Sequence, residues 1–188
     1  MEKATAQEAQ QALIRVLDIG CGDGTHADWF ADRGPLDVVR LDADPDNKPD
    51  VVHDILMPLP NNLTAAFDIV IASHVLEHVP YRDAMAALKH IVSGAVPGGE
   101  VRVYVPSMEW AAQEILAGRE TFGLLGLIWG GQSDPWDNHY CGFTRRSLAA
   151  AMYQVGCVDV KVGESGIIVV IDGKQYDAKQ VVAVGKAP

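Results

Sequence analysis

The stretch Val16–Thr25, VLDIGCGDGT, decides the fold of this chain. It begins as a short apolar run and ends in alternating glycines, and a helical pattern follows from about His26 to Arg33. A strand, a tight glycine-rich turn and a helix start, in that order, place the turn at the carboxyl edge of the first strand, where open α/β sheets bind ligands. Glycine suits such a turn because it adopts positive φ and lets backbone N–H groups approach a ligand. Asp18, at the end of the strand, can accept a hydrogen bond from a ligand donor or from the loop amides.

The glycine spacing distinguishes this turn from the fingerprint that binds dinucleotides. That fingerprint is G-x-G-x-x-G, whereas this chain has G-x-G-x-G, and Thr25 stands where the third glycine is expected. Glycine-rich turns also serve hairpins and helix caps. An adenine dinucleotide is therefore not the best match, which disfavours a nicotinamide-dependent dehydrogenase.

Composition and charge predict one cytoplasmic domain. The 188 residues are 48% hydrophobic, which is ample for a single core. The net charge of −10 and the pI near 4.9 would repel phosphate backbones and anionic headgroups, so we expect neither a nucleic-acid nor a membrane partner. Three cysteines without a C-x-x-C pair fit a reducing compartment. Residues 1–11 are polar, which indicates no signal peptide.

Strand-like and helix-like segments alternate along the first half of the chain, which predicts a parallel sheet with helices on both faces. The expected strands are Val16–Ile19, Leu36–Leu41, Val51–Asp54, Phe67–Ala72 and Glu100–Val105, and later Val158–Val162, Ile167–Ile171 and Val181–Val184. The expected helices are Ala4–Ile14, a first helix from Ala27, Arg82–Val92, Glu109–Leu116 and Thr144–Val155. Asp172-Gly173 predicts a hairpin turn. Which of the late strands join the main sheet stays open.

Six stretches in order resemble the class I S-adenosylmethionine-dependent methyltransferases, in particular the small-molecule branch called type 11. They are Asp18–Gly24, similar to that family's motif I, then Leu41-Asp42, His53-Asp54-Ile55, Phe67–Val79, Pro97-Gly98-Gly99 and Phe143–Cys157. The resemblance implies a Rossmann-like, doubly wound, mostly parallel seven-stranded sheet with an antiparallel C-terminal strand. It also implies one methyltransferase domain over residues 1–188, with a substrate-side insert at about 107–143.

The same resemblance implies S-adenosylmethionine as the cofactor. The residues that would bind it are Asp18, Gly20, Cys21, Gly22, Asp42, Ala43, Asp54, Ile55, Ser73 and His74. Asp42 would take the ribose hydroxyls, and Asp54 and Ile55 would meet the adenine. Turn-forming roles compete with these, because an aspartate after a strand can also accept from its own loop amides.

The insert holds the candidates for contact with the methyl acceptor. They are Trp129, Asp134, Trp136, Asp137, His139 and Tyr140. His139 is the best candidate for a general base, although packing in its loop explains it equally well. The insert also faintly resembles enzymes that act on sugars or other small polar metabolites. Glu77 and His78 are expected to fix the loop to its helix. The histidines and cysteines lack metal-ligand spacing, so no metal site is predicted.

The leading prediction is an enzyme that moves a methyl group from S-adenosylmethionine to a small-molecule acceptor. A module that binds the cofactor or its demethylated product without turnover is the alternative, because motif I would serve both.

Overall fold

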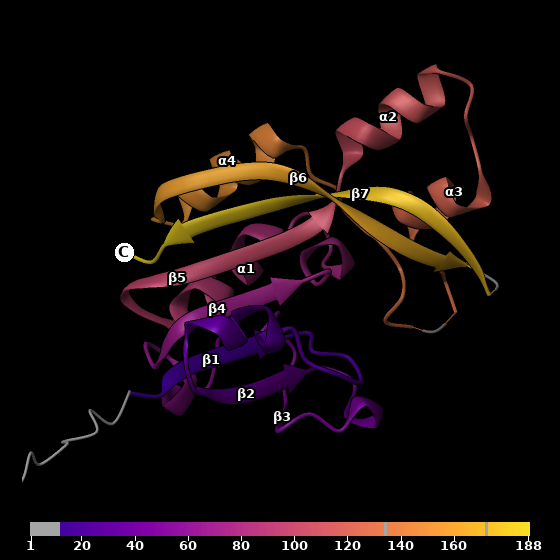
Figure 1. Ribbon diagram of the computed structural model, residues 1–188. Helices are drawn as coiled ribbons and strands as arrows, with labels where there is room; N and C mark the ends of the chain where they lie inside the picture. Colours follow the sequence, from indigo (N-terminus) through magenta and orange to yellow (C-terminus); the bar gives the residue numbers. More distant parts are fainter. Residues whose placement is uncertain (1–11, 134, 172) are drawn as a thin grey trace, which may run out of the picture.

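A single twisted sheet of seven strands forms the centre of the protein, in the order β3-β2-β1-β4-β5-β7-β6 (Figure 1). The computed structural model describes residues 12–188 except 134 and 172. The strands are β1 Ile14–Ile19, β2 Leu36–Asp42, β3 Val51–Val52, β4 Phe67–Ser73, β5 Ala95–Pro106, β6 Val158–Ile171 and β7 Lys174–Lys186. β1 to β5 pair in parallel, and β7 is antiparallel to both β5 and β6. The predicted fold class is confirmed.

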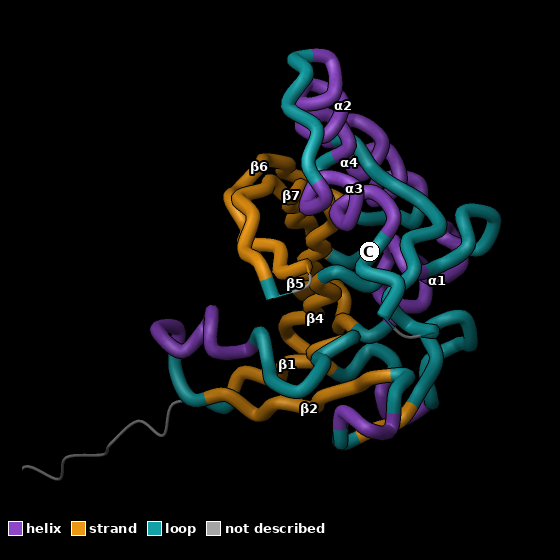
Figure 2. Tube along the Cα trace, turned by 90° about the vertical axis from the view of Figure 1, so that its right-hand side faces the viewer, coloured by secondary structure: helices purple, strands orange, loops and turns teal. Residues whose placement is uncertain are grey.

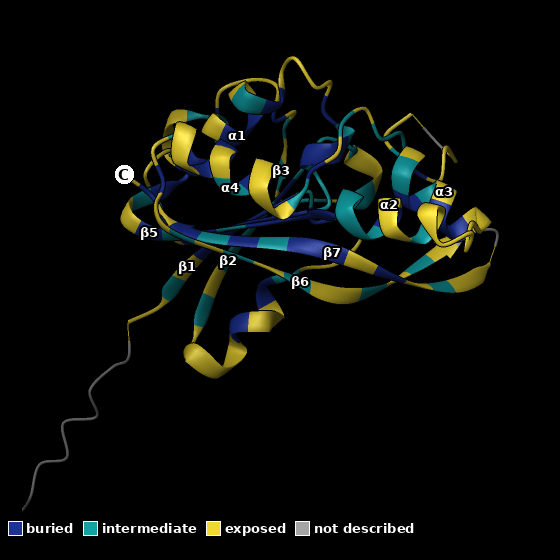
Figure 3. Ribbon diagram, turned by 90° about the horizontal axis from the view of Figure 1, so that it is seen from above, coloured by how far each residue is buried: buried dark blue, intermediate teal, exposed yellow. Residues whose placement is uncertain are grey.

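Helices cover both faces of the sheet, but unequally (Figures 2 and 3). The helices α1 (Ala84–Ser93) and α4 (Arg145–Gln154) pack on one face. The other face carries η1 (Ala27–Arg33), which is a 3-10 helix of seven residues rather than a longer α-helix. Thr144 caps α4 as predicted, because its hydroxyl accepts from the Ser147 amide and the Ser147 side chain accepts from the Thr144 amide.

The central strands are apolar on both sides because both sides are covered. On β1, Leu17 belongs to the large core that also holds Leu88 of α1 and Leu148 of α4. Its neighbour Val16 points the other way and packs with Phe30 of η1. This alternation fixes the register of β1, and so it fixes where the glycine-rich turn leaves the sheet.

The insert packs on the outer half of the hairpin formed by β6 and β7 (Figure 1). It contains α2 (Met108–Leu116) and α3 (Phe122–Trp129), and its two ends meet where Ser107 pairs with Phe143. Leu124 and Leu127 of α3 pack with Ala178 of β7. The insert is therefore held over the carboxyl edge of the parallel strands.

Two expected strands differ in extent at their ends. β3 stops at Val52, short of the predicted Asp54, because the Asp54 carboxylate and carbonyl accept from the amides of Leu56 and Met57 and turn the chain. β5 begins at Ala95, because Ala95 already pairs with Phe67 of β4, and the regular pairing resumes at Glu100 after an irregularity where a break was expected.

The two strands expected at 158–162 and 167–171 are one strand, β6, because β7 pairs with it almost throughout. The turn at residues 172–173 was predicted, and Gly173 has the positive φ that such a turn requires. The helix expected over Ala4–Ile14 falls mainly outside the described residues, and Ile14 opens β1. Among the described residues no helix is long and apolar enough to cross a membrane.

Candidate cofactor and acceptor site

The side chain of Asp18 stabilises the glycine-rich turn that follows β1. This carboxylate is fully buried, and its Oδ2 accepts from the Thr25 hydroxyl at 2.9 Å and from the His26 amide at 2.5 Å. Its Oδ1 lies 3.0 Å from His26 Nδ1. The sequence left open whether Asp18 accepts from a ligand or from the loop, and in the structure it accepts from the loop. Gly20 and Gly22 follow with φ of +67° and +58°, values that glycine adopts without strain.

Asp42 ends β2 directly beside this turn. Its Oδ2 accepts from the Gly22 amide at 2.9 Å, and its Oδ1 accepts from the Asp44 amide at 2.9 Å. Each oxygen keeps a further lone pair, because a carboxylate oxygen can accept more than one hydrogen bond. The carboxylate thus ties the turn to the neighbouring strand and still presents acceptors to a ligand.

A cavity of about 300 Å³ opens at this edge of the sheet. The predicted cofactor residues that line it are Gly20, Gly22, Asp42, Ala43, Asp54, Ile55 and His74. Other lining residues include Leu41, Asp44, His53, Val75, His78 and Trp136. Acidic groups and apolar side chains both line this cavity, which suits a nucleoside, because its ribose offers donors and its base offers flat apolar faces. The Asp54 carboxylate stabilises its own turn, and Asp54 also lines the cavity, so the two roles that the sequence left open for it are compatible.

Three predicted cofactor residues stand apart from this cavity lining. Asp18 lies below the turn, and the buried thiol of Cys21 lies 3.3 Å from the Gly22 carbonyl. Burial, helped by the charges of Asp42 and Asp18, raises the pKa of Cys21 to about 11, so this thiol is neutral at physiological pH. Ser73 lines a second cavity instead. A cofactor contact by these three stays a prediction.

The second cavity, of about 440 Å³, adjoins the first and shares His74 and His78 with it. Its other walls come from the insert, from η1 and from the carboxyl-terminal end of β6. They include His26, Trp29, Ser73, Leu127, Asp137, His139, Ile167–Val170 and Gln180. Two cavities that share a wall can hold two reactants next to each other.

His74 stands at the junction, in a backbone conformation with φ of +54° that is uncommon outside glycine. Its Nδ1 lies 2.9 Å from Glu77 Oε1 and its Nε2 lies 2.8 Å from Gln180 Oε1. Burial alone would lower the pKa of His74, but the Glu77 carboxylate and the two hydrogen bonds raise it above its usual range. Burial would raise the pKa of Glu77, but His74, and then His78 and His139, hold it below its usual range. Each ring nitrogen of His74 thus faces an acceptor oxygen, and both pKa directions favour the ion pair.

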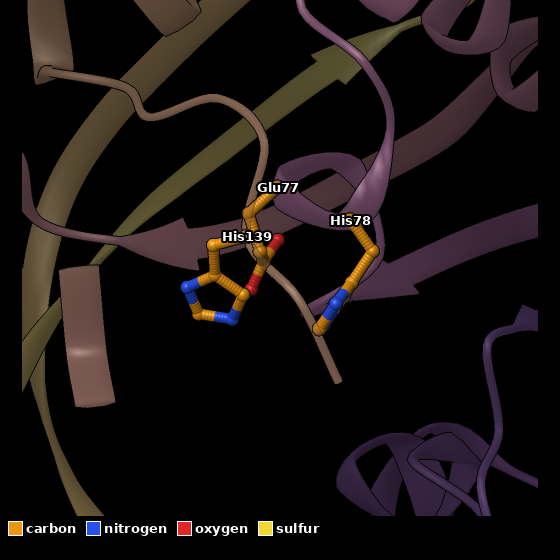
Figure 4. Close-up of side chains that lie close together, drawn as sticks. All are labelled: Glu77, His78 and His139. Atoms are coloured by element: carbon orange, nitrogen blue, oxygen red, sulfur yellow. The ribbon is translucent and has the colours of Figure 1, made fainter. Parts of the chain in front are cut away.

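Glu77, His78 and His139 form a group that the sequence did not indicate (Figure 4). One possible ligand atom from each lies within 4.8 Å of the others. Glu77 and His78 lie in η4 (Leu76–His78), directly after β4, whereas His139 comes from the insert. The Glu77 carbonyl accepts from the amides of Tyr140 and Cys141, which brings the end of the insert back to η4. The sequence signal was limited to the adjacent Glu77 and His78 shortly after β4, which carry no ligand spacing by themselves.

The other candidates in the insert differ in which cavity they line. Trp136 lines the first cavity and Asp137 lines the second. Trp129 and Tyr140 are exposed by 58% and 56% and line neither cavity. Asp134 lies outside the described residues.

Residues 2–162 match a family model described as a methyltransferase domain. The chain belongs to this family. It is 32% identical over 99 residues to the ubiquinone biosynthesis O-methyltransferase of Idiomarina loihiensis, and the match covers 46% of this chain and 40% of that protein. The chain thus spans about two fifths of the curated relative that it matches.

Solved structures share the fold. A SAM-dependent methyltransferase from Archaeoglobus fulgidus superposes with a TM-score of 0.64 at 18% identity, over 93% of this chain and 86% of that one. The 1,6-didemethyltoxoflavin-N1-methyltransferase of Burkholderia thailandensis, solved with S-adenosylhomocysteine, gives 0.56 at 16% identity over 93% and 71%. The predicted membership of the class I S-adenosylmethionine-dependent methyltransferases, with that cofactor, is confirmed.

Proposed function

We propose that this protein transfers the methyl group of S-adenosylmethionine to a hydroxyl group of a small-molecule acceptor. The observation that carries the proposal is the pair of adjoining cavities, which share His74 and His78 as a common wall. The first has the acids and the glycine-rich turn that suit a nucleoside, and the second lies under the insert, where an acceptor would bind. A cytoplasmic location and a single domain over residues 1–188 stay predictions.

The lining of the second cavity favours an acceptor with both polar and apolar parts. Ile167–Val170 and Leu127 supply apolar wall, while Asp137, His139 and Gln180 supply polar groups. A bare sugar would leave the apolar wall uncovered, so a hydroxylated metabolite with an apolar body fits better. The curated relative is an O-methyltransferase, which supports a hydroxyl as the acceptor group.

The residues of the first cavity would hold and orient the cofactor. Asp42 would accept from the ribose hydroxyls, Asp54 would accept from the adenine amino group, and Ile55 would cover the ring. The cofactor supplies a methyl group already activated on a sulfonium sulfur. The protein therefore contributes mainly position and the exclusion of water, which can account for most of a rate enhancement.

Radiolabelled methyl transfer to a panel of small molecules tests the proposal. Phenols and aliphatic alcohols with apolar bodies should accept label, whereas amines, carboxylates and simple sugars should accept less. Tight cofactor binding without any acceptor would indicate the binding module instead. Heat from NADH without heat from S-adenosylmethionine in a calorimetric titration would contradict both.

Replacing Asp42 with alanine should weaken cofactor binding by about 1–3 kcal/mol, the size of a lost charge-assisted hydrogen bond. The change removes the ribose acceptor and also frees the Gly22 amide, so the turn loses its tie to β2. Calorimetry with S-adenosylhomocysteine measures the effect. Asp37→Asn, on the same strand and more than half exposed, is the matched control and should bind like wild type. Equal affinities for the two variants would place the ribose elsewhere.

A further inference from the structure

The Glu77 carboxylate has an oxygen without a partner. Its Oε1 is hydrogen-bonded to His74, but Oε2 is buried and has no hydrogen-bond partner among the described residues. The side chain is only 1% exposed. A buried unpaired carboxylate oxygen is costly, and in a native structure it calls for an explanation such as an ion.

Each of the two histidines beside Glu77 is held by a backbone hydrogen bond on one ring nitrogen, which leaves the other nitrogen for a metal ion. His78 Nδ1 lies 3.1 Å from the Asn138 carbonyl, and His139 Nδ1 lies 3.0 Å from the Leu127 carbonyl. A carbonyl can only accept, so each Nδ1 carries a proton and Nε2 is the nitrogen left for a bond to a metal ion. This backbone bond on the far nitrogen is the usual support of a metal-binding histidine.

The spacing is close to that of a metal site. Ligand atoms about 2.1 Å from one ion are at most about 4.2 Å apart, and the three atoms here lie within 4.8 Å of one another. The two rings lie edge to face, at 78° with centroids 4.7 Å apart. His74, bonded to the other Glu77 oxygen, would orient the carboxylate as outer-shell partners do.

We propose that Glu77, His78 and His139 bind one divalent transition-metal ion at the wall between the two cavities, where it contacts the hydroxyl of the acceptor. Two neutral imidazoles and one carboxylate favour Zn²⁺, Fe²⁺ or Co²⁺ over Mg²⁺, Ca²⁺ and Mn²⁺, which prefer oxygen ligands. His78 and His139 line the acceptor cavity, so an ion held by three protein ligands would present open positions there.

The role of the ion rests on the proposed function. A cation lowers the pKa of a hydroxyl that it contacts. The hydroxyl proton would leave to water, and the oxygen lone pair would form the new O–CH₃ bond as the S–CH₃ bond breaks, with its electron pair remaining on sulfur. The step needs no oxidant or reductant.

Metal content provides the first test. Tag-free protein, stripped with a chelator and dialysed against Zn²⁺ or Co²⁺, should retain about one equivalent, and Co²⁺ should give the visible d–d absorption of a nitrogen and oxygen site. Loss of an outer-shell partner costs about 10–100-fold in metal affinity, so His78→Gln and His139→Gln, which remove ligands, should cost at least as much. His90→Gln is the matched control, because His90 Nδ1 also bonds a carbonyl, that of Ile55, but His90 is outside the group.

The outcomes separate the metal site from the proposed function. Wild type that binds no more Co²⁺ than the two ligand variants would overturn the metal site, and so would methyl transfer that is unchanged in chelated protein. Metal binding at these residues with no methyl transfer to any acceptor would keep the site and overturn the function. Circular dichroism of each variant verifies that it is folded, and Glu77→Gln supplies a third ligand variant.

Discussion

Gly20→Val should abolish measurable cofactor binding while leaving the protein folded. Gly20 has φ of +67°, which costs a residue with a Cβ about 1–2 kcal/mol and a β-branched residue more. A Cβ at this position would also overlap Cγ2 of Val75, which lines the same cavity. Overpacking of this kind costs about 1–3 kcal/mol. A combined cost of about 3 kcal/mol in the cofactor-binding conformation corresponds to about 100-fold in affinity.

The fold should survive Gly20→Val because the strain falls on the turn. β1 is paired on both sides, with β2 and with β4, so the strand stays in place while the turn moves away from its cofactor-binding conformation. Circular dichroism should be unchanged, and calorimetry with S-adenosylhomocysteine should give no heat.

Gly24→Ala is the matched control in the same turn. A Cβ at Gly24 would have no neighbour within 4 Å among the described residues, and its φ lies outside the left-handed region. A substitution at an open surface position changes stability by no more than about 0.5 kcal/mol. The affinity for the cofactor should therefore stay within about twofold of wild type. If both glycine variants bind normally, the turn does not hold the cofactor.

The cofactor edge could be predicted from the sequence because its parts are local. Gly20 follows β1 and Asp42 ends β2, and the carboxyl ends of parallel strands meet at one edge of a sheet. The structure places both residues on one cavity. Asp18 shows the limit of this reasoning, since a carboxylate at that edge serves a ligand or the loop, and only the packing shows that the loop takes it.

The group around Glu77 could not be predicted in the same way. His139 lies far from Glu77 in the sequence, and the two meet only because the amides of Tyr140 and Cys141 bond the Glu77 carbonyl. Such a return of a loop depends on tertiary packing, here of α3 on the β6–β7 hairpin. An isolated histidine in a loop and an acid in a short helix carry no ligand spacing by themselves, which is why the sequence predicted no metal site.

His139→Ala should lower turnover by about 10²–10⁴-fold, the range for removing a group that handles a proton in the transition state. His139 lines the second cavity and not the first, so the dissociation constant for the cofactor should change little. Single-turnover methyl transfer, paired with calorimetry on the cofactor alone, measures the two effects separately. Unchanged turnover would remove His139 from the mechanism.

Chemical rescue of His139→Ala distinguishes a proton acceptor from a metal ligand. His139 Nδ1 is fixed by the Leu127 carbonyl, so in either role Nε2 is the working atom, and added imidazole can take its place in the space left by the substitution. If His139 takes the proton itself, imidazole should restore turnover in chelated enzyme. If His139 holds an ion together with Glu77 and His78, imidazole should restore turnover only when Zn²⁺ or Co²⁺ is also supplied.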